Sequence, residues 1–213
     1  MIERKHTALE MFATSCGMTG RFDESKRDFD ELLASASRIY GHEHVNTRIV
    51  CGNRSLLLQR MVQKAEDLVL RDDLANGARY LDAVLIESKA PDFFDAKNPN
   101  VQINYEIMVR AASVLGMIGR SQESLEVARL CLKSARERKD LDSEWNQKSM
   151  WDYAKASYDL YGPTKDSKQM LAKLLAIQAR LYGPDGPKTQ ATANLLSRLN
   201  LSDAGVTRLL SQR

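Results

Sequence analysis

The spacing of apolar residues is the feature of this sequence that most restricts its fold. Between Val101 and Ile118 apolar residues recur every three or four positions, which places them on one face of an α-helix. The segment from Ser121 to Arg138 repeats this spacing, and the breaker Gly119-Arg120 lies between the two, with Ser121 as a candidate N-cap. Almost no segment alternates apolar and polar residues as a strand does. The sequence therefore predicts an all-α protein.

Composition and charge exclude several classes of protein. The 213 residues carry 31 Lys+Arg against 28 Asp+Glu, and this net charge of +3 is too small to indicate a nucleic-acid or membrane-surface protein. No apolar run approaches the roughly 18–20 residues of a membrane span, and the N-terminus lacks a secretory signal. Three widely spaced cysteines without a Cys-x-x-Cys pair predict neither disulfides nor zinc. We expect an intracellular, cytoplasmic protein, or an organellar one after removal of a transit peptide.

Two internal repeats indicate a tandem array of helices. The segment GMTGRFDES at 17–25 matches GMIGRSQES at 116–124 in six of nine positions, at an offset of 99 residues. A second match joins residues 39–41 to 181–183 at an offset of 142, with Thr47 and Thr189 in the same register. Fixed offsets of this kind are typical of repeat proteins.

The repeated segments resemble the tetratricopeptide repeat, a pair of helices with small and large residues at fixed positions. Three copies share one register: Leu9, Phe12, Ala13, Cys16, Ser25 and Phe29; Met108, Ala111, Ala112, Leu115, Ser124 and Ala128; Trp151, Ala154, Lys155, Tyr158, Ser167 and Leu171. Serine replaces the family's usual alanine in each copy, and Lys155 stands where a small residue is expected. Residues 76–83 resemble the turn and second helix of a further copy with one extra residue. Trp151 and Phe29 are expected to fill the gaps between pairs.

The loops between pairs resemble those of kinesin-light-chain-like repeats, in which Gly ends one helix and Pro begins the next. Residues 40–45, 98–101 and 181–189 carry this resemblance. It implies a right-handed superhelical solenoid of stacked antiparallel pairs, about nine to eleven helices long, as one domain over residues 1–213. The pairs are expected near 3–40, 45–90, 99–138 and 142–182, followed by capping helices at 187–199 and 202–212. The long stretch 45–74 is either a lengthened first helix or includes an additional helix.

No catalytic or cofactor-binding pattern occurs in the sequence. Phosphate-binding glycine motifs are missing, and the His42-x-His44 pair lies in a loop where a capping role explains it better than metal binding. Scattered carboxylates such as Glu66-Asp67 are typical of solvated helix faces. We therefore predict a protein that is not an enzyme and has no catalytic residues, cofactor or metal site.

The resemblance implies a concave groove, lined by first helices, that holds a segment of a partner protein. The assigned register places in the groove Glu10, Thr14, Glu106, Ser113, Asp152 and Asp159. The resemblance adds Asn53 and Asn194, which match asparagines that bond the peptide backbone in similar repeats. Such an acidic or neutral groove favours a basic or polar peptide. The predicted function is that of an adaptor or scaffold. The alternatives are a structural subunit or assembly factor of a larger complex and, less favoured because Lys and Arg are evenly spread, a helical-repeat RNA-binding protein.

Overall fold

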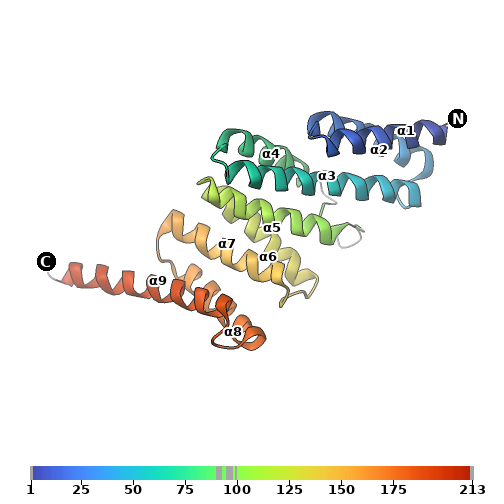
Figure 1. Ribbon diagram of the computed structural model, residues 1–213. Coiled ribbons are helices and arrows are strands. Elements are labelled where there is room, and N and C mark those ends of the chain that lie inside the picture. Colours follow the sequence, from blue (N-terminus) through green and yellow to red (C-terminus); the bar gives the residue numbers. More distant parts are fainter. Residues whose placement is uncertain (1, 90–92, 95–97, 99, 212–213) are drawn as a thin grey trace. The chain divides into compact units, whose positions relative to one another are not determined.

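A computed structural model describes the backbone of residues 2–89, 93–94, 98 and 100–211, and the side chains of 7–17, 19–89, 93–94, 98 and 100–199. These residues form helices and no strand (Figure 1), which confirms the all-α prediction. The helices are α1 (Ile2–Met18), α2 (Phe22–Tyr40), α3 (Val45–Val69), α4 (Leu74–Glu87), α5 (Val101–Met117), α6 (Ser121–Glu137), α7 (Glu144–Tyr161), α8 (Lys165–Tyr182) and α9 (Pro187–Ser211).

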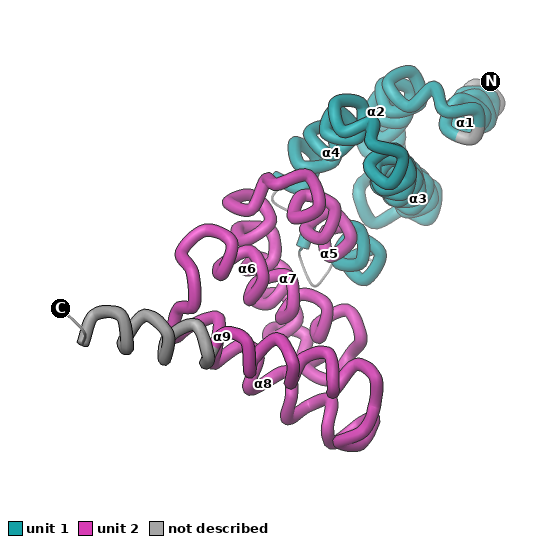
Figure 2. Tube along the Cα trace, turned by 60° about the vertical axis from the view of Figure 1, so that its left-hand side comes forward, with its two compact units in different colours: residues 1–107 teal, residues 108–213 magenta. Residues whose placement is uncertain are grey.

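The chain divides into two compact units, residues 1–107 and 108–213, and the division falls within α5 (Figure 2). In the first unit α2 packs on α1, α3 on α2 and α4 on α3, and α1 also contacts α3. In the second unit α7 packs on α6, α8 on α7 and α9 on α8. These packed helices thus bury their apolar stripes against their neighbours in the sequence.

The repeated segment 17–25 forms a tight turn between α1 and α2. Gly20 adopts a left-handed conformation with φ of 82°, and the N–H of Arg21 donates to the carbonyl of Cys16 at 2.8 Å. This bond satisfies a carbonyl that the end of α1 would otherwise leave unpaired. The buried Ser25 hydroxyl then donates back to the Ala13 carbonyl at 2.6 Å. A small residue at position 25 therefore lets α2 approach the backbone of α1.

The segment 116–124 forms the same turn between α5 and α6. Gly119 has a φ of 78°, the N–H of Arg120 donates to the Leu115 carbonyl at 2.9 Å, and Ser124 donates to the Ala112 carbonyl at 2.8 Å. Ser121 is not the N-cap that we predicted, because Arg120 holds that position and makes no side-chain capping bond. The left-handed glycine ends α5 so sharply that only three residues separate the two helices, and Ser121 becomes the first residue of α6.

A third turn of this kind joins α3 to α4, although its sequence does not match that of the other two turns. Asp72 takes the left-handed conformation with φ of 62°, and the N–H of Asp73 donates to the Leu68 carbonyl at 2.9 Å. Residues 76–83 lie inside α4 and do not contain the turn, contrary to our alignment of this copy. The long stretch that begins at Val45 is one lengthened helix, α3, of 25 residues. Likewise, α9 is continuous where we expected two helices, since neither Gly nor Pro stands between Leu199 and Ser202 to end it.

In this third turn the glycine lies on the second helix of the pair instead of the first. Gly77 occupies the position of Ser25, and Val69 occupies the position of Gly17. A Cβ on Gly77 would lie 2.7 Å from Val69 Cγ2, closer than carbon atoms tolerate. The glycine therefore makes room for the valine, so that the combined size at the crossing is kept.

Substituting Gly77→Ser should consequently destabilise the protein by about 1–2 kcal/mol through overpacking. Adding Val69→Ala should recover part of that loss, because it restores space at the crossing. Gly52→Ser in α3, where a new Cβ has ordinary room, is the matched control and should be neutral or stabilising. Urea unfolding measures the wild type, the two single variants at 69 and 77, the double variant and the control. Additive effects of the two changes on the free energy of unfolding would refute the exchange of bulk between these positions.

The core of the second unit shows where the predicted gap-filling residue lies. Its buried cluster consists of Leu132, Met150, Ala154, Leu171, Leu174 and Leu199. Trp151 packs against this cluster but is only half-buried. Phe29, the other residue predicted to fill a gap, lies in the first unit and is 2% exposed. Phe29 therefore fills a closed gap, whereas Trp151 leaves one face accessible.

Candidate functional site

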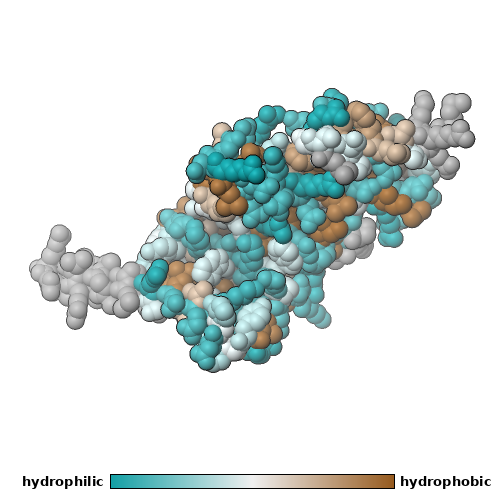
Figure 3. Space-filling model, viewed as in Figure 1, coloured by the Kyte–Doolittle hydropathy of each residue, from teal (hydrophilic) through white to brown (hydrophobic). Residues whose placement is uncertain are grey.

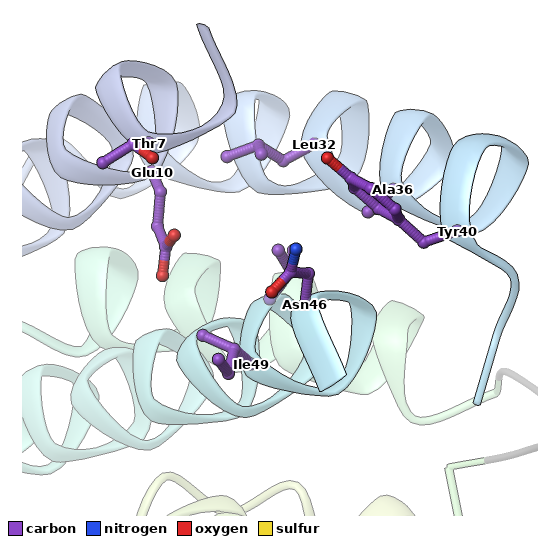
Figure 4. Close-up of a pocket in the computed structure, with 8 residues that line it drawn as sticks. Thr7, Glu10, Leu32, Ala36, Tyr40, Asn46 and Ile49 are labelled. Atoms are coloured by element: carbon purple, nitrogen blue, oxygen red, sulfur yellow. The ribbon is translucent and has the colours of Figure 1, made fainter. Parts of the chain in front are cut away.

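The first unit contains a cavity of about 250 Å³ between α1, α2 and α3, the α1–α3 cavity (Figure 4). Its lining residues are Thr7, Glu10, Leu32, Ala36, Tyr40, Asn46, Ile49 and Val50. Figure 4 shows the Glu10 side chain reaching from α1 toward α3. There its carboxylate accepts a hydrogen bond from Asn53 Nδ2 at 2.5 Å. The cavity therefore has an apolar floor on α2 and a polar edge that ties α1 to α3.

The start of α3 borders this cavity and explains one of the loop histidines. His44 is the N-cap of α3, and its Nδ1 accepts a hydrogen bond from the N–H of Asn46 at 3.2 Å. Its ring also stacks on Tyr40, with ring centroids 4.8 Å apart. These contacts give His44 the capping role that we predicted.

The second unit contains a cavity of about 280 Å³ between α7, α8 and α9, the α7–α9 cavity. Its lining residues are Glu144, Gln147, Lys148, Trp151, Gln178, Lys188, Ala191 and Thr192. Lys188 forms an ion pair with Glu144 at 2.6 Å and lies 5.4 Å from the centre of the Tyr182 ring. The hydrogen bond from Lys188 lowers the pKa of Glu144, so this pair stays charged at the rim of the cavity.

The two cavities occupy the same register of the sequence. Four lining positions of the first recur in the second at an offset of 142 residues: Ala36 and Gln178, Asn46 and Lys188, Ile49 and Ala191, Val50 and Thr192. This is the offset at which the loop motifs repeat. The repeat that the sequence shows in its loops thus extends to a recurring cavity between successive helix pairs.

The α7–α9 cavity also holds a buried hydrogen-bond acceptor without a donor. Gln147 is 4% exposed, and its Nε2 donates to the Asp142 carbonyl at 3.0 Å and to the Tyr182 hydroxyl at 3.3 Å. Because a carbonyl can only accept, the amide nitrogen faces Asp142, and Gln147 Oε1 has no partner among the described residues. Buried polar atoms are usually paired, so this oxygen is an exception. A donor from a ligand would satisfy it once the Gln147 side chain turned the oxygen toward the cavity.

In the first unit, the structure brings together some of the predicted groove residues. Glu10 lines the α1–α3 cavity and bonds Asn53, as described above. Thr14 is exposed and shares with Asn53 a small depression of about 50 Å³. Glu106 is half-buried and accepts a hydrogen bond from Gln102 at 2.9 Å.

In the second unit, the predicted groove carboxylates already have partners within the chain. Asp152 is only 7% exposed and accepts a hydrogen bond from Ser113 at 2.6 Å. Asp159 is exposed and pairs with Lys155 at 3.0 Å, while Asn194 is exposed on α9. None of these residues lines the α7–α9 cavity. Of the residues that do line it, the sequence analysis had singled out Trp151 alone. Extending the 142-residue offset along α8 and α9 would have found Ala191 and Thr192.

Burial raises the pKa of Asp152, although Lys148 and the Ser113 hydroxyl oppose this shift. The folded protein therefore holds this proton more tightly than the unfolded chain does. Its stability should fall as the pH rises from the ordinary carboxyl range through the folded pKa, and should stay lower above it.

Asp152→Asn should remove this dependence, because the neutral amide still offers Ser113 an acceptor and never ionises. The difference in free energy of unfolding between variant and wild type should grow in favour of the variant from about pH 4 to pH 7. Urea unfolding at several pH values measures it. Asp159→Asn at the exposed site is the control, and equal pH profiles for wild type and Asp152→Asn would contradict the assignment.

Other kinds of site have little basis in the described part of the chain. No three His, Cys, Asp or Glu side chains gather there as a metal ion would require. Burial, and then the nearby Asp152 carboxylate, raise the pKa of the Cys131 thiol, which keeps it protonated and unreactive. No described helix combines the length and apolar content needed to cross a bilayer.

Exposed apolar side chains are scattered over several helices. They include Phe12, Ile49, Leu130 and Leu141, each close to half exposed. On the face seen in Figure 3, apolar residues form separate patches between hydrophilic ones. In comparisons with known proteins, no family model matches the chain and no curated protein sequence matches it. The two cavities are therefore the features on which a function can be argued.

Proposed function

We propose that this protein is a non-enzymatic adaptor of the tetratricopeptide type, whose helix pairs stack into a right-handed superhelical solenoid. It binds a segment of a partner protein on the face formed by its first helices. The observation that carries this proposal is the recurrence of a cavity between successive helix pairs, at one register, in both units. A recurring cavity suits a ligand that itself repeats, as a polypeptide does.

The size of the cavities supports a peptide ligand. Sites for drug-sized molecules and cofactors usually measure about 300–1,000 Å³. At about 250 and 280 Å³, the two cavities lie just below that range and suit single side chains of a bound segment.

The polar groups narrow the chemistry of that segment. Asp159 is paired with Lys155 and Asp152 is buried, so these two offer a basic peptide little accessible charge. Glu10 accepts a hydrogen bond from the neutral Asn53 and keeps its charge. Gln147 Oε1 instead offers an acceptor beside the apolar wall of Trp151. The partner segment therefore inserts apolar side chains and donates an N–H to Gln147, and its net charge is secondary.

Blocking the α7–α9 cavity tests this function. Peptides of 12 residues would be selected from a random phage library against the wild-type protein and measured by fluorescence anisotropy. Ala191→Phe should fill the cavity with the protein's own side chain and weaken the selected peptides by at least about tenfold, a loss of 1.4 kcal/mol. Ser197→Phe adds the same ring at an exposed position of α9 outside the cavity and should leave binding unchanged.

The alternative of a structural subunit gives a different result. A subunit removed from its complex should self-associate through exposed apolar patches in size-exclusion chromatography, whereas an adaptor should run as a single species. Selected peptides that bind Ala191→Phe as tightly as the wild type would refute binding at the first-helix face. Lys at position 152 is unsuitable as a test, because Asp152 is buried and a charge reversal there would disturb folding.

A further inference from the structure

A third cavity, in the second unit, lies between α6, α7 and α8, where α7 packs on both of the other helices (Figure 2). This outer cavity measures about 340 Å³ and is lined by Leu132, Arg136, Leu141, Asn146, Met150, Met170, Lys173, Ala176 and Ile177. It shares no residue with the α7–α9 cavity, so its use does not depend on the function proposed above.

The walls of the outer cavity are apolar. Leu132 and Met150 belong to the buried core, and Met170 and Ile177 pack against it. The Asn146 side-chain nitrogen is engaged, because it donates to the Leu141 carbonyl at 2.6 Å. Methionine side chains adapt readily to the shape of a bound apolar group. The interior therefore suits one apolar side chain.

The rim of the outer cavity is positively charged. Arg136 on α6 and Lys173 on α8 are both exposed, and no described carboxylate lies within ion-pair distance of either. The nearest candidates are already paired: Glu137 with Lys133 at 3.9 Å, Asp140 with Arg138 at 3.8 Å, and Asp142 with Arg180 at 2.5 Å. Two uncompensated cations thus flank an apolar cavity.

The helix that carries Lys173 adds to this field. Besides Lys173, the sequence of α8 contains Lys165, Lys168 and Arg180 against the single carboxylate Asp166, and of these Arg180 is paired with Asp142. An excess of one sign beside a cavity attracts a ligand of the other sign and raises its rate of association.

We propose that the outer cavity binds an acidic segment of a partner protein, which inserts one apolar side chain and sets flanking carboxylates against Arg136 and Lys173. The apolar walls of the cavity favour an apolar side chain over a nucleic-acid backbone, and its limited volume favours one side chain over a lipid surface. Nucleic-acid binding usually needs more phosphate contacts than two cations supply.

Methionine signals of the full-length protein provide a direct test. With ¹³C-labelled methionine methyl groups, Met150 and Met170 report on the cavity itself. The probe is the peptide acetyl-Gly-Glu-Leu-Glu-Gly-amide, and its controls replace Leu by Ser or both Glu by Lys. The acidic leucine peptide should shift both methyl signals in a saturable manner, and each control peptide should bind about tenfold more weakly or not at all.

Charge reversal at the rim then identifies the recognition groups. Arg136→Glu with Lys173→Glu should weaken the acidic peptide by about tenfold. Lys64→Glu with Arg71→Glu changes the net charge equally at exposed positions of the first unit and should leave binding within about twofold. Circular dichroism verifies that both variants stay folded.

Three results would overturn the proposal. The Lys peptide could bind as well as the Glu peptide, the methyl signals of Met150 and Met170 could remain unmoved at saturation, or the rim reversal could leave affinity unchanged. An oligouridine or vesicles containing phosphatidylserine, used as competitors, should not displace the peptide. Displacement by either would assign the rim to phosphate groups instead.

Discussion

Phe29→Ala should lower the free energy of unfolding by about 3–5 kcal/mol, the range for removing a fully buried phenylalanine. Phe29 is 2% exposed on the buried face of α2, four residues after Ser25, which brings α2 against α1. Truncation would leave a cavity that the tight α1–α2 turn prevents from collapsing. Urea unfolding followed by circular dichroism measures the loss.

Phe12→Ala provides the matched control within the same copy of the repeat. Phe12 is 48% exposed on α1, and its ring contacts the Arg21 guanidinium at 5.8 Å. Its removal should cost about 1 kcal/mol or less. A loss below about half a kcal/mol for Phe29→Ala, the usual range of surface changes, would contradict the register assigned to the first pair.

Glu87→Gln should have the second largest effect, about 3 kcal/mol. The Glu87 side chain is 7% exposed at the end of α4, where it pairs with Arg54 and, at 2.8 Å, with Lys26. Asp30 completes the group, 3.0 Å from Arg54 and 2.8 Å from Lys26. Burial alone would lower the pKa of Lys26, but its hydrogen bonds to Asp30 and Glu87 raise it. Removing the Glu87 charge leaves two cations with one half-exposed carboxylate, and this imbalance is the source of the loss.

An exposed ion pair between the same two helices gives the comparison. Arg79 and Asp23 join α4 to α2 at 2.7 Å, but about three quarters of each side chain is exposed. Asp23→Asn should therefore cost less than about 1 kcal/mol, and urea unfolding measures both variants. Replacing Lys26, Arg54 and Glu87 together by Met, Met and Leu should restore most of the lost stability, since an apolar set of similar volume removes the unpaired charge. If the triple variant were less stable to urea than Glu87→Gln, the loss in Glu87→Gln could not be explained by unpaired charge alone.

The local features of the fold could be predicted from the sequence. The spacing between Val101 and Ile118 predicted a helix, and α5 ends one residue earlier, at Met117. The matching segments 17–25 and 116–124 form the same turn, and in each the serine hydroxyl donates to a carbonyl of the preceding helix. These features depend on residues a few positions apart, and the period of a helix records them directly in the sequence.

Features that depend on bulk shared between two helices could not be predicted. The α3–α4 turn could not be recognised by alignment, because its glycine lies on the second helix of the pair instead of the first. Alignment therefore counts both positions of the crossing, Val69 and Gly77, as mismatches. What packing requires is that the two side chains facing each other at the crossing together fit the space, and the sequence of one helix does not show this.

The candidate site divides in the same way. The sequence by itself determined that Thr14 and Asp159 lie on exposed faces of first helices, because that depends on the helical period. It placed Asp152 on the same face, where the structure buries it. Only the tertiary structure decided that Glu10, Asp152 and Asp159 are occupied by partners from the chain, and that Gln147, Arg136 and Lys173 are not. The partners of Glu10 and Asp152 come from other helices, 43 and 39 residues away in the sequence. Whether a polar group is free to bind a ligand depends on such distant neighbours, and these are set by packing rather than by spacing along the chain.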